Sequence, residues 1–382
     1  MLLLLTGSWY TYGQYQRDWV RHYGRTLVSE SRSIIEVSDG SLLVSGYTIR
    51  EGSFRADAWL IKLDPLTGRK VWEKKYGEKD WDEVTAVVET SDHHLMVLGW
   101  THNRKGKRTD TWLMRLDLDG KLIWEKFYGD KRWDEAFSIV EAKDGGFAIA
   151  ACVNKRNEND DIHLFKIDKQ GEVLWDTILG GDGRDKAHGI YSLRNGDILA
   201  VGYYSLTKEE KENGWAGRFS LDGDLIWEYK FGGEATDALH DAVELENGQI
   251  ILVGFTRSHN EKHQADLWVV KLNADGQVIH EKTFGEHKFE KGRKIVQTRD
   301  GGFAIAGFTL SKGMGKADIW VLKLNKDLEL EWEDTFGGGG YDVARTMIEL
   351  DDGALVIAGK IDLLSTAAYL LVRYNRQNGP SD

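Results

Sequence analysis

Histidine and arginine side chains that could do chemistry recur at one position of a repeated pattern in this chain. The position lies three residues after a repeated acid, and its occupants are Arg32, Thr85, Phe137, His188, His240, Arg293 and Arg345. Arginine can bind a carboxylate or sulfate group, and histidine beside arginine can take a proton from a sugar acid. The competing interpretation, which we favour, is that these basic residues form ion pairs with the preceding acids.

The acid that defines this position could itself bind a metal. It is Asp82, Asp134, Asp185, Asp237, Glu290 and Asp342, with Ser29 in the first unit. Six carboxylates near one end of a channel could hold calcium, which prefers several oxygen ligands. A short acid before a strand also accepts hydrogen bonds from backbone N–H groups of the turn. We expect this structural role and no cofactor, with calcium as the one candidate.

Aromatic residues come directly before four of these acids. They are Trp81, Trp133, Phe289 and Tyr341. Aromatic rings at one mouth of a ring-shaped fold can form a stacking platform for sugar rings or peptides. The alternative is that they cap their unit and pack on a neighbour, and we favour this packing role.

A glycine at a spacing of 51 to 53 residues defines the repeat that positions these side chains. It occurs as Gly24, Gly77, Gly129, Gly180, Gly232, Gly285 and Gly337. Each unit holds four short runs rich in β-branched and aromatic residues, separated by Asp-Gly, Asn-Gly or Gly-Gly turn signals. Repeats of this length are typical of propellers and solenoids. The sequence predicts an all-β, seven-bladed β-propeller with four antiparallel strands per blade.

The two ends of the chain predict how this ring closes. The last unit stops near Asn378 without a fourth strand, whereas 19–24 matches the fourth strand of the next unit, 72–77. We expect the N-terminal strand to complete the last blade, which removes an open sheet edge. Residues 15–382 then form a single domain, and a monomer is the simplest expectation.

Eleven of the fifteen tryptophans occupy two repeated positions, which indicates a packing role. One of these positions ends the segment Leu63–Trp72, in which an aspartate and a turn glycine precede the tryptophan. This segment resembles the tryptophan-docking motif of quinoprotein-like (PQQ-type) propellers. The pattern around 336–359 is similar to repeats of exported bacterial propellers of undefined activity. The resemblance implies the architecture and almost nothing about activity.

Composition excludes some classes of partner. The chain has 50 Lys and Arg against 62 Asp and Glu, a formal net charge of −12, which argues against nucleic acid or an anionic membrane. No apolar run is long enough to span a bilayer. Residues 1–14 resemble a truncated signal peptide, which predicts a secreted or periplasmic protein. A frayed tail on a cytoplasmic protein is the alternative.

Standard catalytic signatures are absent from the sequence: there is no Gly-x-Ser-x-Gly, His-Glu-x-x-His, phosphate-binding glycine loop or paired-cysteine site. The leading hypothesis is therefore a non-catalytic scaffold that binds a protein or extracellular polymer. The first alternative is a glycan-binding protein or polysaccharide lyase that uses the His, Arg and aromatic residues above. A quinoprotein-like enzyme is a third, disfavoured because the chain lacks adjacent cysteines.

Overall fold

The computed structural model describes residues 15–24, 27–49, 52–53, 55–77, 81–103, 108–129, 133–155, 159–205, 207, 209–259, 264–363 and 366–376. The expected signal peptide, residues 1–14, lies outside this part of the chain. All regular elements within the described part are strands. No described helix is long and apolar enough to cross a membrane.

The strands are short and follow one another through tight turns, as the β-branched runs and Asp-Gly turns predict. Their bounds are β1 (Tyr15–Tyr23), β2 (Val28–Glu36), β3 (Leu42–Ile49), β4 (Ala56–Leu63), β5 (Lys70–Tyr76), β6 (Asp82–Glu89), β7 (Leu95–Asn103), β8 (Arg108–Leu116), β9 (Leu122–Tyr128), β10 (Trp133–Glu141), β11 (Phe147–Lys155), β12 (Asn159–Ile167), β13 (Val173–Leu179), β14 (Lys186–Ser192), β15 (Ile198–Tyr204), β16 (Asn213–Phe219), β17 (Leu225–Phe231), β18 (Asp237–Glu244), β19 (Ile250–Thr256), β20 (Asp266–Leu272), β21 (Val278–Phe284), β22 (Glu290–Gln297), β23 (Phe303–Thr309), β24 (Asp318–Leu324), β25 (Leu330–Phe336), β26 (Val343–Glu349), β27 (Leu355–Leu363) and β28 (Thr366–Arg376).

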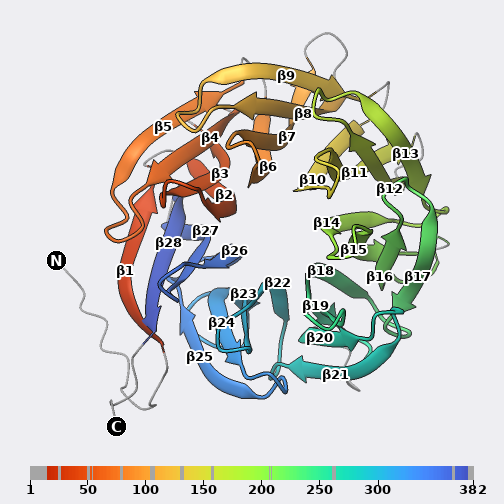
Figure 1. The fold of residues 1–382 in the computed structure, drawn as a ribbon. Coiled ribbons are helices and arrows are strands. Elements are labelled where there is room, and N and C mark those ends of the chain that lie inside the picture. The colour runs from red at the N-terminus through yellow and green to blue at the C-terminus, as the bar shows by residue number, and fades with distance from the viewer. Residues whose placement is uncertain are drawn as a thin grey trace.

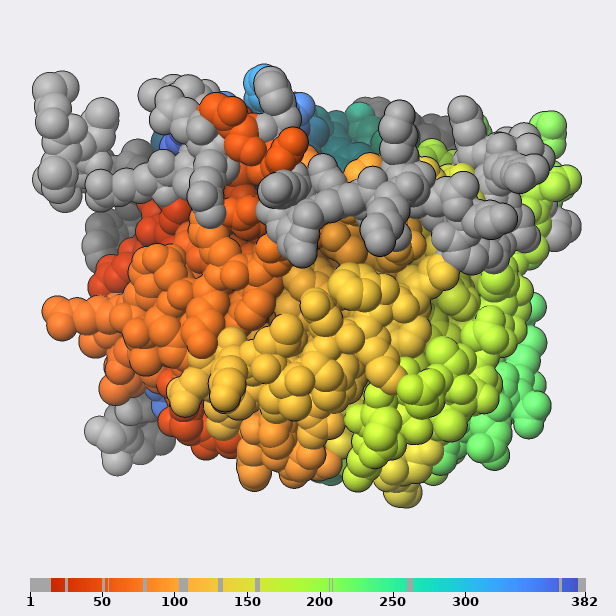
Figure 2. All heavy atoms as spheres, turned by 90° about the horizontal axis from the view of Figure 1, so that it is seen from above, coloured from red at the N-terminus to blue at the C-terminus, as the bar shows by residue number. Residues whose placement is uncertain are grey.

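Sets of four antiparallel strands, which we call blades, stand around a common axis (Figure 1). The strands β2, β6, β10, β14, β18, β22 and β26 are innermost, and the fourth strand of each set lies at the rim. Seen from the side, successive segments of the chain follow one another around the disc, from orange through yellow to green (Figure 2). The all-β propeller class predicted from the repeat is thus confirmed.

Five blades are separate four-stranded sheets, whereas the first and last sets share one eight-stranded sheet. A single parallel bridge between Val28 of β2 and Ala367 of β28 joins the two sets. On the outer side, β1 pairs antiparallel with β28 from Tyr15↔Arg376 to Tyr23↔Tyr369, where the sequence placed it.

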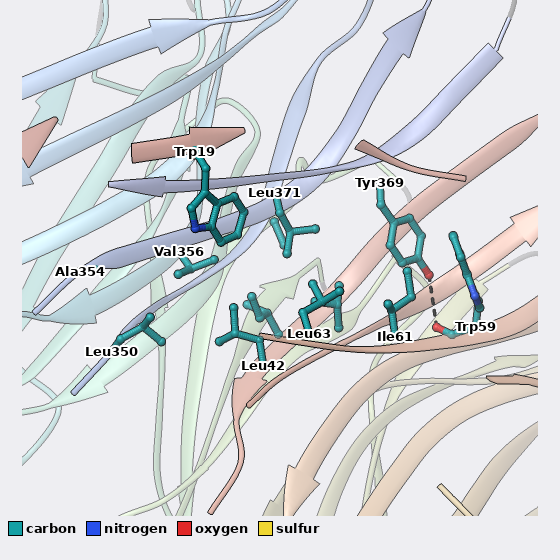
Figure 3. Packing of buried hydrophobic residues seen from close by; sticks show 13 residues of the cluster. Trp19, Leu42, Trp59, Ile61, Leu63, Leu350, Ala354, Val356, Tyr369 and Leu371 are labelled. Carbon is teal, nitrogen blue, oxygen red and sulfur yellow. Dashed lines mark hydrogen bonds between the residues drawn. The ribbon is translucent and has the colours of Figure 1, made fainter. Parts of the chain in front are cut away.

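The hydrophobic core lies between neighbouring blades, because each sheet buries both faces against the next. Figure 3 shows the cluster between the last and first sets, in which Trp19 of β1 lies near Leu371 of β28 and Leu42 of β3. The Trp59 and Tyr369 rings are 4.6 Å apart, and the Tyr369 hydroxyl donates to the Trp59 carbonyl at 3.3 Å. The third-strand tryptophans are buried, as their repeat position predicted: Trp59, Trp112, Trp215, Trp268 and Trp320.

Rim tryptophans dock on a turn glycine of the following blade. A Cβ on Gly223 would lie 2.8 Å from the Trp175 ring, and Gly223 has a φ of +92°, which favours glycine. The Trp175 indole N–H donates to the Leu221 carbonyl at 3.1 Å. Trp19 of β1 has the same relation to Gly68 of the first blade, where a Cβ would lie 3.3 Å from the indole. The N-terminal strand therefore contacts both the last blade and the first.

Candidate anion site at the ring axis

All seven residues of the variable position lie at β-bulges of the innermost strands. In each blade the pairing of the first two strands shifts register at this one residue. A bulged residue is left out of the ladder, and its side chain is re-aimed relative to its neighbours. We call this set the axial ring: Arg32, Thr85, Phe137, His188, His240, Arg293 and Arg345.

A glycine on the second strand accommodates each bulge in six of the blades. A Cβ on Gly307 would lie 1.8 Å from the carbonyl oxygen of Lys291, and one on Gly202 would lie 1.8 Å from that of Lys186. Glycine lacks a Cβ and so favours this close approach of two backbones. The third blade has Ala151 at the equivalent place. The repeated glycine that ends the second apolar run of a unit is therefore a sequence signal for the bulge, and our sequence reasoning missed it.

Two histidines of the axial ring meet on neighbouring blades. The His188 and His240 rings are 4.5 Å apart and tilted by 49°. His240 is only 7% exposed, and its Nε2 has no hydrogen-bond partner in the described structure. Burial lowers the pKa of both histidines well below the usual value, and the charge of Lys291 lowers it further. Both imidazoles are therefore neutral at pH 7.

Two cations next to this pair have no carboxylate partner among the described residues. They are Lys291 and Arg293 of β22, and both are half-buried. The Arg293 Nε is buried and makes no hydrogen bond. Burial lowers the pKa of Lys291 well below its usual value, and Arg293 and Arg345 add repulsion. An unpaired cation in such a place is costly, and a bound anion would offset that cost.

The other two arginines of the axial ring are paired. Arg32 Nε donates to Glu83 Oε1 at 2.6 Å and its Nη1 to Glu30 Oε1 at 3.0 Å. Arg345 Nε donates to the same Glu30 oxygen at 2.5 Å. Glu30 and Glu83 directly follow the acid position, so the partners are not the preceding acids that the sequence suggested. The positive charge left without a partner is thus concentrated at Lys291 and Arg293.

Aromatic rings lie on both sides of the histidine pair. On one side, the Phe255 ring is 6.1 Å from that of His240, and the Lys291 ammonium is 4.6 Å from the centre of Phe255. On the other side, Tyr203 and Phe137 lie 5.5 and 6.1 Å from the ring of His188. Sequence reasoning missed Phe255 and Tyr203, because they occupy strand positions where aromatic residues are common; it noted Lys186 and Lys291 only as nearby partners for ion pairs.

The four aromatic residues proposed as one platform have different surroundings. Trp81 packs on Tyr47 at 5.6 Å and on Trp100 at 6.4 Å. Phe289 belongs to a buried cluster with Phe255. Trp133 and Tyr341 are exposed, at 48% and 50%. Trp81 and Phe289 thus have packing roles.

The repeated acids are bound by the loops beside them. Asp237 accepts hydrogen bonds from Thr256 Oγ1 at 2.6 Å, Ser258 Oγ at 2.6 Å and Gly233 N at 2.9 Å. Asp185 likewise accepts from Ser205 N at 2.7 Å. The described residues contain no group of three or more acids, histidines or cysteines that could hold a metal ion. The geometry supports the structural role of these acids, including Asp82, Asp134, Glu290 and Asp342.

Fold and site together define a β-propeller with an anion-attracting cluster of histidine, lysine and arginine at its axis. The chain belongs to the arylsulfotransferase (ASST) family, whose model matches residues 117–319, just over half of the sequence. This span includes His188, His240, Lys291 and Arg293. The match does not confirm the expected quinoprotein-like family.

Solved structures similar to this chain are also propellers. The WD40 domain of Pan2 from Neurospora crassa has 12% identity and a TM-score of 0.55, covering 91% of this chain and 90% of that one. A protein of unknown function from Dyadobacter fermentans has 12% identity and a TM-score of 0.55, covering 95% and 100%. The propeller domain of the Trilobed protease from Pyrococcus furiosus has 11% identity and a TM-score of 0.52, covering 95% and 97%. At these identities the likeness concerns the fold alone. A comparison with curated proteins finds no match.

The family corrects the leading hypothesis drawn from the sequence. A non-catalytic scaffold is wrong, because arylsulfotransferases are enzymes of sulfuryl transfer. The physical reason for the error is the construction of the site. The candidate residues come from separate blades, so they form no local motif of the kind sought in the sequence.

Proposed function

We propose that this protein transfers a sulfuryl group from an aryl sulfate to a hydroxyl acceptor at the axial ring. The observation that carries the proposal is that Lys291 and Arg293, which have no carboxylate partner among the described residues, lie close to the paired imidazoles of His188 and His240. An aryl sulfate carries one negative charge on three oxygens. Guanidinium and ammonium groups are the side chains best suited to hold it.

The cations stabilise the transferring group. Negative charge on the sulfuryl oxygens and on the leaving aryl oxygen must be held while the sulfur–oxygen bond breaks. Fixed cations in a partly buried site do this effectively, because water screens them little. Arg293 has no competing carboxylate in the described structure, whereas Arg32 and Arg345 are already occupied by Glu30 and Glu83.

The His188 and His240 imidazoles transfer the protons of the reaction. An acceptor hydroxyl must lose its proton as it attacks sulfur, and the leaving aryl oxide must gain one. A neutral imidazole can accept the first proton and supply the second, so the overall reaction is balanced. Burial and the neighbouring Lys291 keep His188 and His240 in the neutral form that this role needs.

We also propose that the ring is a seven-bladed propeller whose last blade is completed by β1. The pairing of β1 with β28 and the contact of Trp19 with Gly68 support this arrangement. A closed ring would keep the axial residues at fixed separations, which catalysis by several blades requires.

The test is transfer from 4-nitrophenyl sulfate to phenol, followed by release of 4-nitrophenolate and by mass detection of phenyl sulfate. We expect acceptor-dependent release by the wild type, and loss of most of it in Arg293→Met and in His240→Gln. The matched control is Arg299→Met, because the Arg299 side chain is 51% exposed and its guanidinium pairs with Asp351 at 2.7 Å in a turn. If 4-nitrophenolate is released without an acceptor, the activity is hydrolysis of the sulfate ester and not transfer. Absence of release at any acceptor concentration would refute the proposal.

A further inference from the structure

The last residue of an innermost strand forms a repeated hydrogen bond between blades. In five of the seven described innermost strands this residue is a glutamate: Glu36, Glu89, Glu141, Glu244 and Glu349. The two oxygens of Glu141 accept the Ser91 N–H at 2.8 Å and the Ser91 hydroxyl at 2.7 Å, from the β6–β7 turn of the preceding blade. The Arg194 N–H donates to Glu244 in the same way, at 2.7 Å. The glutamate carboxylate therefore binds the turn of the preceding blade.

The junction between the third and fourth blades departs from this arrangement. Here the innermost strand, β14, ends with Ser192, whose hydroxyl makes no hydrogen bond among the described residues. The turn residue that corresponds to Ser91 is Lys143, and its N–H has no acceptor in the described part of the chain. An open cavity of about 460 Å³ lies at this junction, lined by Ser192, Lys143 and the neighbouring turns. The place that a glutamate carboxylate fills at other junctions is therefore open.

Three basic side chains line this cavity. They are Lys143 of the β10–β11 turn, Lys169 of the β12–β13 turn and Arg194 of the β14–β15 turn. All three are exposed, and none forms an ion pair with a described residue. Lys169 Nζ lies 2.8 Å from the point that a Cβ on Gly145 would occupy, and Lys143 Cδ lies 3.1 Å from the corresponding point of Gly196. Each lysine side chain thus lies over a turn glycine at the edge of the cavity.

The acidic side chains of the cavity already have hydrogen-bond donors. Both oxygens of Glu141 are bound by Ser91. Asp144 accepts from Lys166 Nζ at 2.5 Å and from the Gly146 N–H at 3.1 Å. With Lys166 included, four basic side chains stand against two acidic ones here. The cavity is therefore locally positive on a chain with a formal net charge of −12, which favours an anionic ligand.

We propose that this cavity binds a small carboxylate that carries two or more negative charges. One carboxylate group takes the place of the glutamate and accepts from the Lys143 N–H and the Ser192 hydroxyl, as Glu141 does from Ser91. The remaining negative charge pairs with the side chains of Lys143, Lys169 and Arg194, whose donors suit carboxylate oxygens. Ser192 follows His188 by four residues on β14, about 13 Å along the strand, so the site is separate from the axial ring. The inference does not depend on the proposed sulfuryl transfer.

Isothermal titration calorimetry with citrate as the probe tests the site, at an ionic strength held constant with sodium chloride. We expect saturable binding of one citrate per chain, and at least tenfold weaker binding of acetate, which has a single charge. Lys169→Met should weaken citrate binding about 3- to 10-fold. The matched control is Lys326→Met, because Lys326 occupies the corresponding turn of the sixth blade and its side chain is 79% exposed. This control should bind citrate as the wild type does.

The sharper variant is Ser192→Glu, which restores the glutamate of the other blades. It should weaken citrate binding at least tenfold and melt no lower than the wild type without citrate, because its carboxylate fills the site. Gln297→Glu makes the same change at the end of β22 and should leave citrate binding unchanged. The Lys169→Met titration decides the question if Ser192→Glu does not fold.

Three results would overturn the proposal. The first is a wild type that does not bind citrate, or a Ser192→Glu variant that binds it equally well. The second is loss of citrate binding in Arg293→Met with retention in Ser192→Glu, which would place the anion at the axial ring. The third is equal affinity for citrate and inorganic phosphate, which would show general attraction of anions and not recognition of a carboxylate.

Discussion

The imidazole rings of His188 and His240 lie 4.5 Å apart because both are bulge residues at the same place in two adjacent blades. One repeat length in the sequence becomes one step around the axis in space. Residues at the same position of consecutive repeats therefore become neighbours in space, and in the axial ring they form one cluster. The same relation places Arg293 and Arg345 next to each other on the following blades.

The pH dependence of activity should reveal the neutral histidines and the perturbed lysine. Because the pKa values of His188 and His240 are lowered, the acid limb of kcat/KM should lie well below pH 6.5, the usual histidine value. The pKa of Lys291 is also lowered, so the alkaline limb should come well below the ordinary lysine value of about 10.4. A pH–rate profile of wild type and Lys291→Met checks this, since the variant should lose the alkaline limb. An acid limb at or above pH 6.5 would contradict the assignment.

The same histidines should make folding stability depend on pH. In the unfolded chain they titrate near pH 6.5, whereas in the fold they stay neutral to lower pH. Below about pH 6.5 the unfolded state binds more protons, so the free energy of unfolding falls by up to about 1.4 kcal/mol per pH unit for each group. Urea denaturation at pH 7.5 and 5.5 measures this loss. The double variant His188→Gln, His240→Gln should lose less stability than the wild type over the same interval.

Removal of Arg293 should separate its catalytic role from a structural one. In Arg293→Met we expect kcat/KM to fall by about 10²- to 10³-fold, the usual effect of losing one stabilising donor. The melting temperature should stay the same or rise, because the substitution removes a half-buried cation without a carboxylate partner. Arg218 offers the opposite case, since it pairs with Asp197 at 2.7 Å in the hairpin turn of its blade. Arg218→Met should keep activity and lower stability by about 1–3 kcal/mol.

The two kinds of tryptophan should differ sharply in thermal denaturation. Trp268 is fully buried between blades, so Trp268→Ala should lower stability by about 3–5 kcal/mol. Trp133 is 48% exposed at the start of β10, so Trp133→Ala should change stability by less than about 0.5 kcal/mol. Equal losses in the two variants would contradict the burial seen here.

Much of the fold could be predicted from the sequence because each blade repeats its own turn chemistry. The Asp-Gly and Asn-Gly turns mark the hairpins, and the third-strand tryptophans mark the buried faces. The position of the axial ring was also predictable, since it lies at a fixed offset of three residues from the repeated acid. The bulge that re-aims these side chains was indicated by the glycine opposite it, as at Gly307 and Gly202.

The charge balance of the site could not be predicted from the sequence. Glu30 forms ion pairs with Arg32 and Arg345, and Glu83 forms one with Arg32. These pairs form only because the fold brings neighbouring blades together around the axis. Lys291 has no carboxylate partner among the described residues for the same reason, although the sequence contains more acids than bases. The favoured interpretation of ion pairing with the preceding acids failed at this step, because Lys291 and Arg293 have no carboxylate partner among the described residues.

The repeated acids give a test of the calcium hypothesis. The oxygens of Asp237 already accept hydrogen bonds from Thr256, Ser258 and Gly233, so we expect neither calcium nor EDTA to shift the melting temperature. Asp237→Asn should lower stability by about 2–3 kcal/mol. The NH2 group of asparagine would replace one carboxylate oxygen, and it cannot accept the hydrogen bonds that this oxygen receives. A rise in melting temperature with calcium, lost in the variant, would restore the metal hypothesis.

The pairing of β1 with β28 should affect both the folding stability of the protein and its tendency to self-associate. Arg17 of β1 pairs with Asp334 of the preceding blade at 2.5 Å, and Trp19 packs in the cluster that joins the last and first sets. Without β1, the outer edge of β28 would present unpaired backbone groups, which promote sheet-to-sheet association. A chain lacking residues 1–23 should therefore melt at a lower temperature and elute as larger species in size-exclusion chromatography. Arg17→Ala keeps the strand and removes a partly exposed ion pair with Asp334 together with a cation–π contact of 4.7 Å with Phe336. This variant should stay unchanged in size and lose only about 1–2 kcal/mol. A truncated chain with the size and melting temperature of the full chain would show that β1 does not hold the ring together.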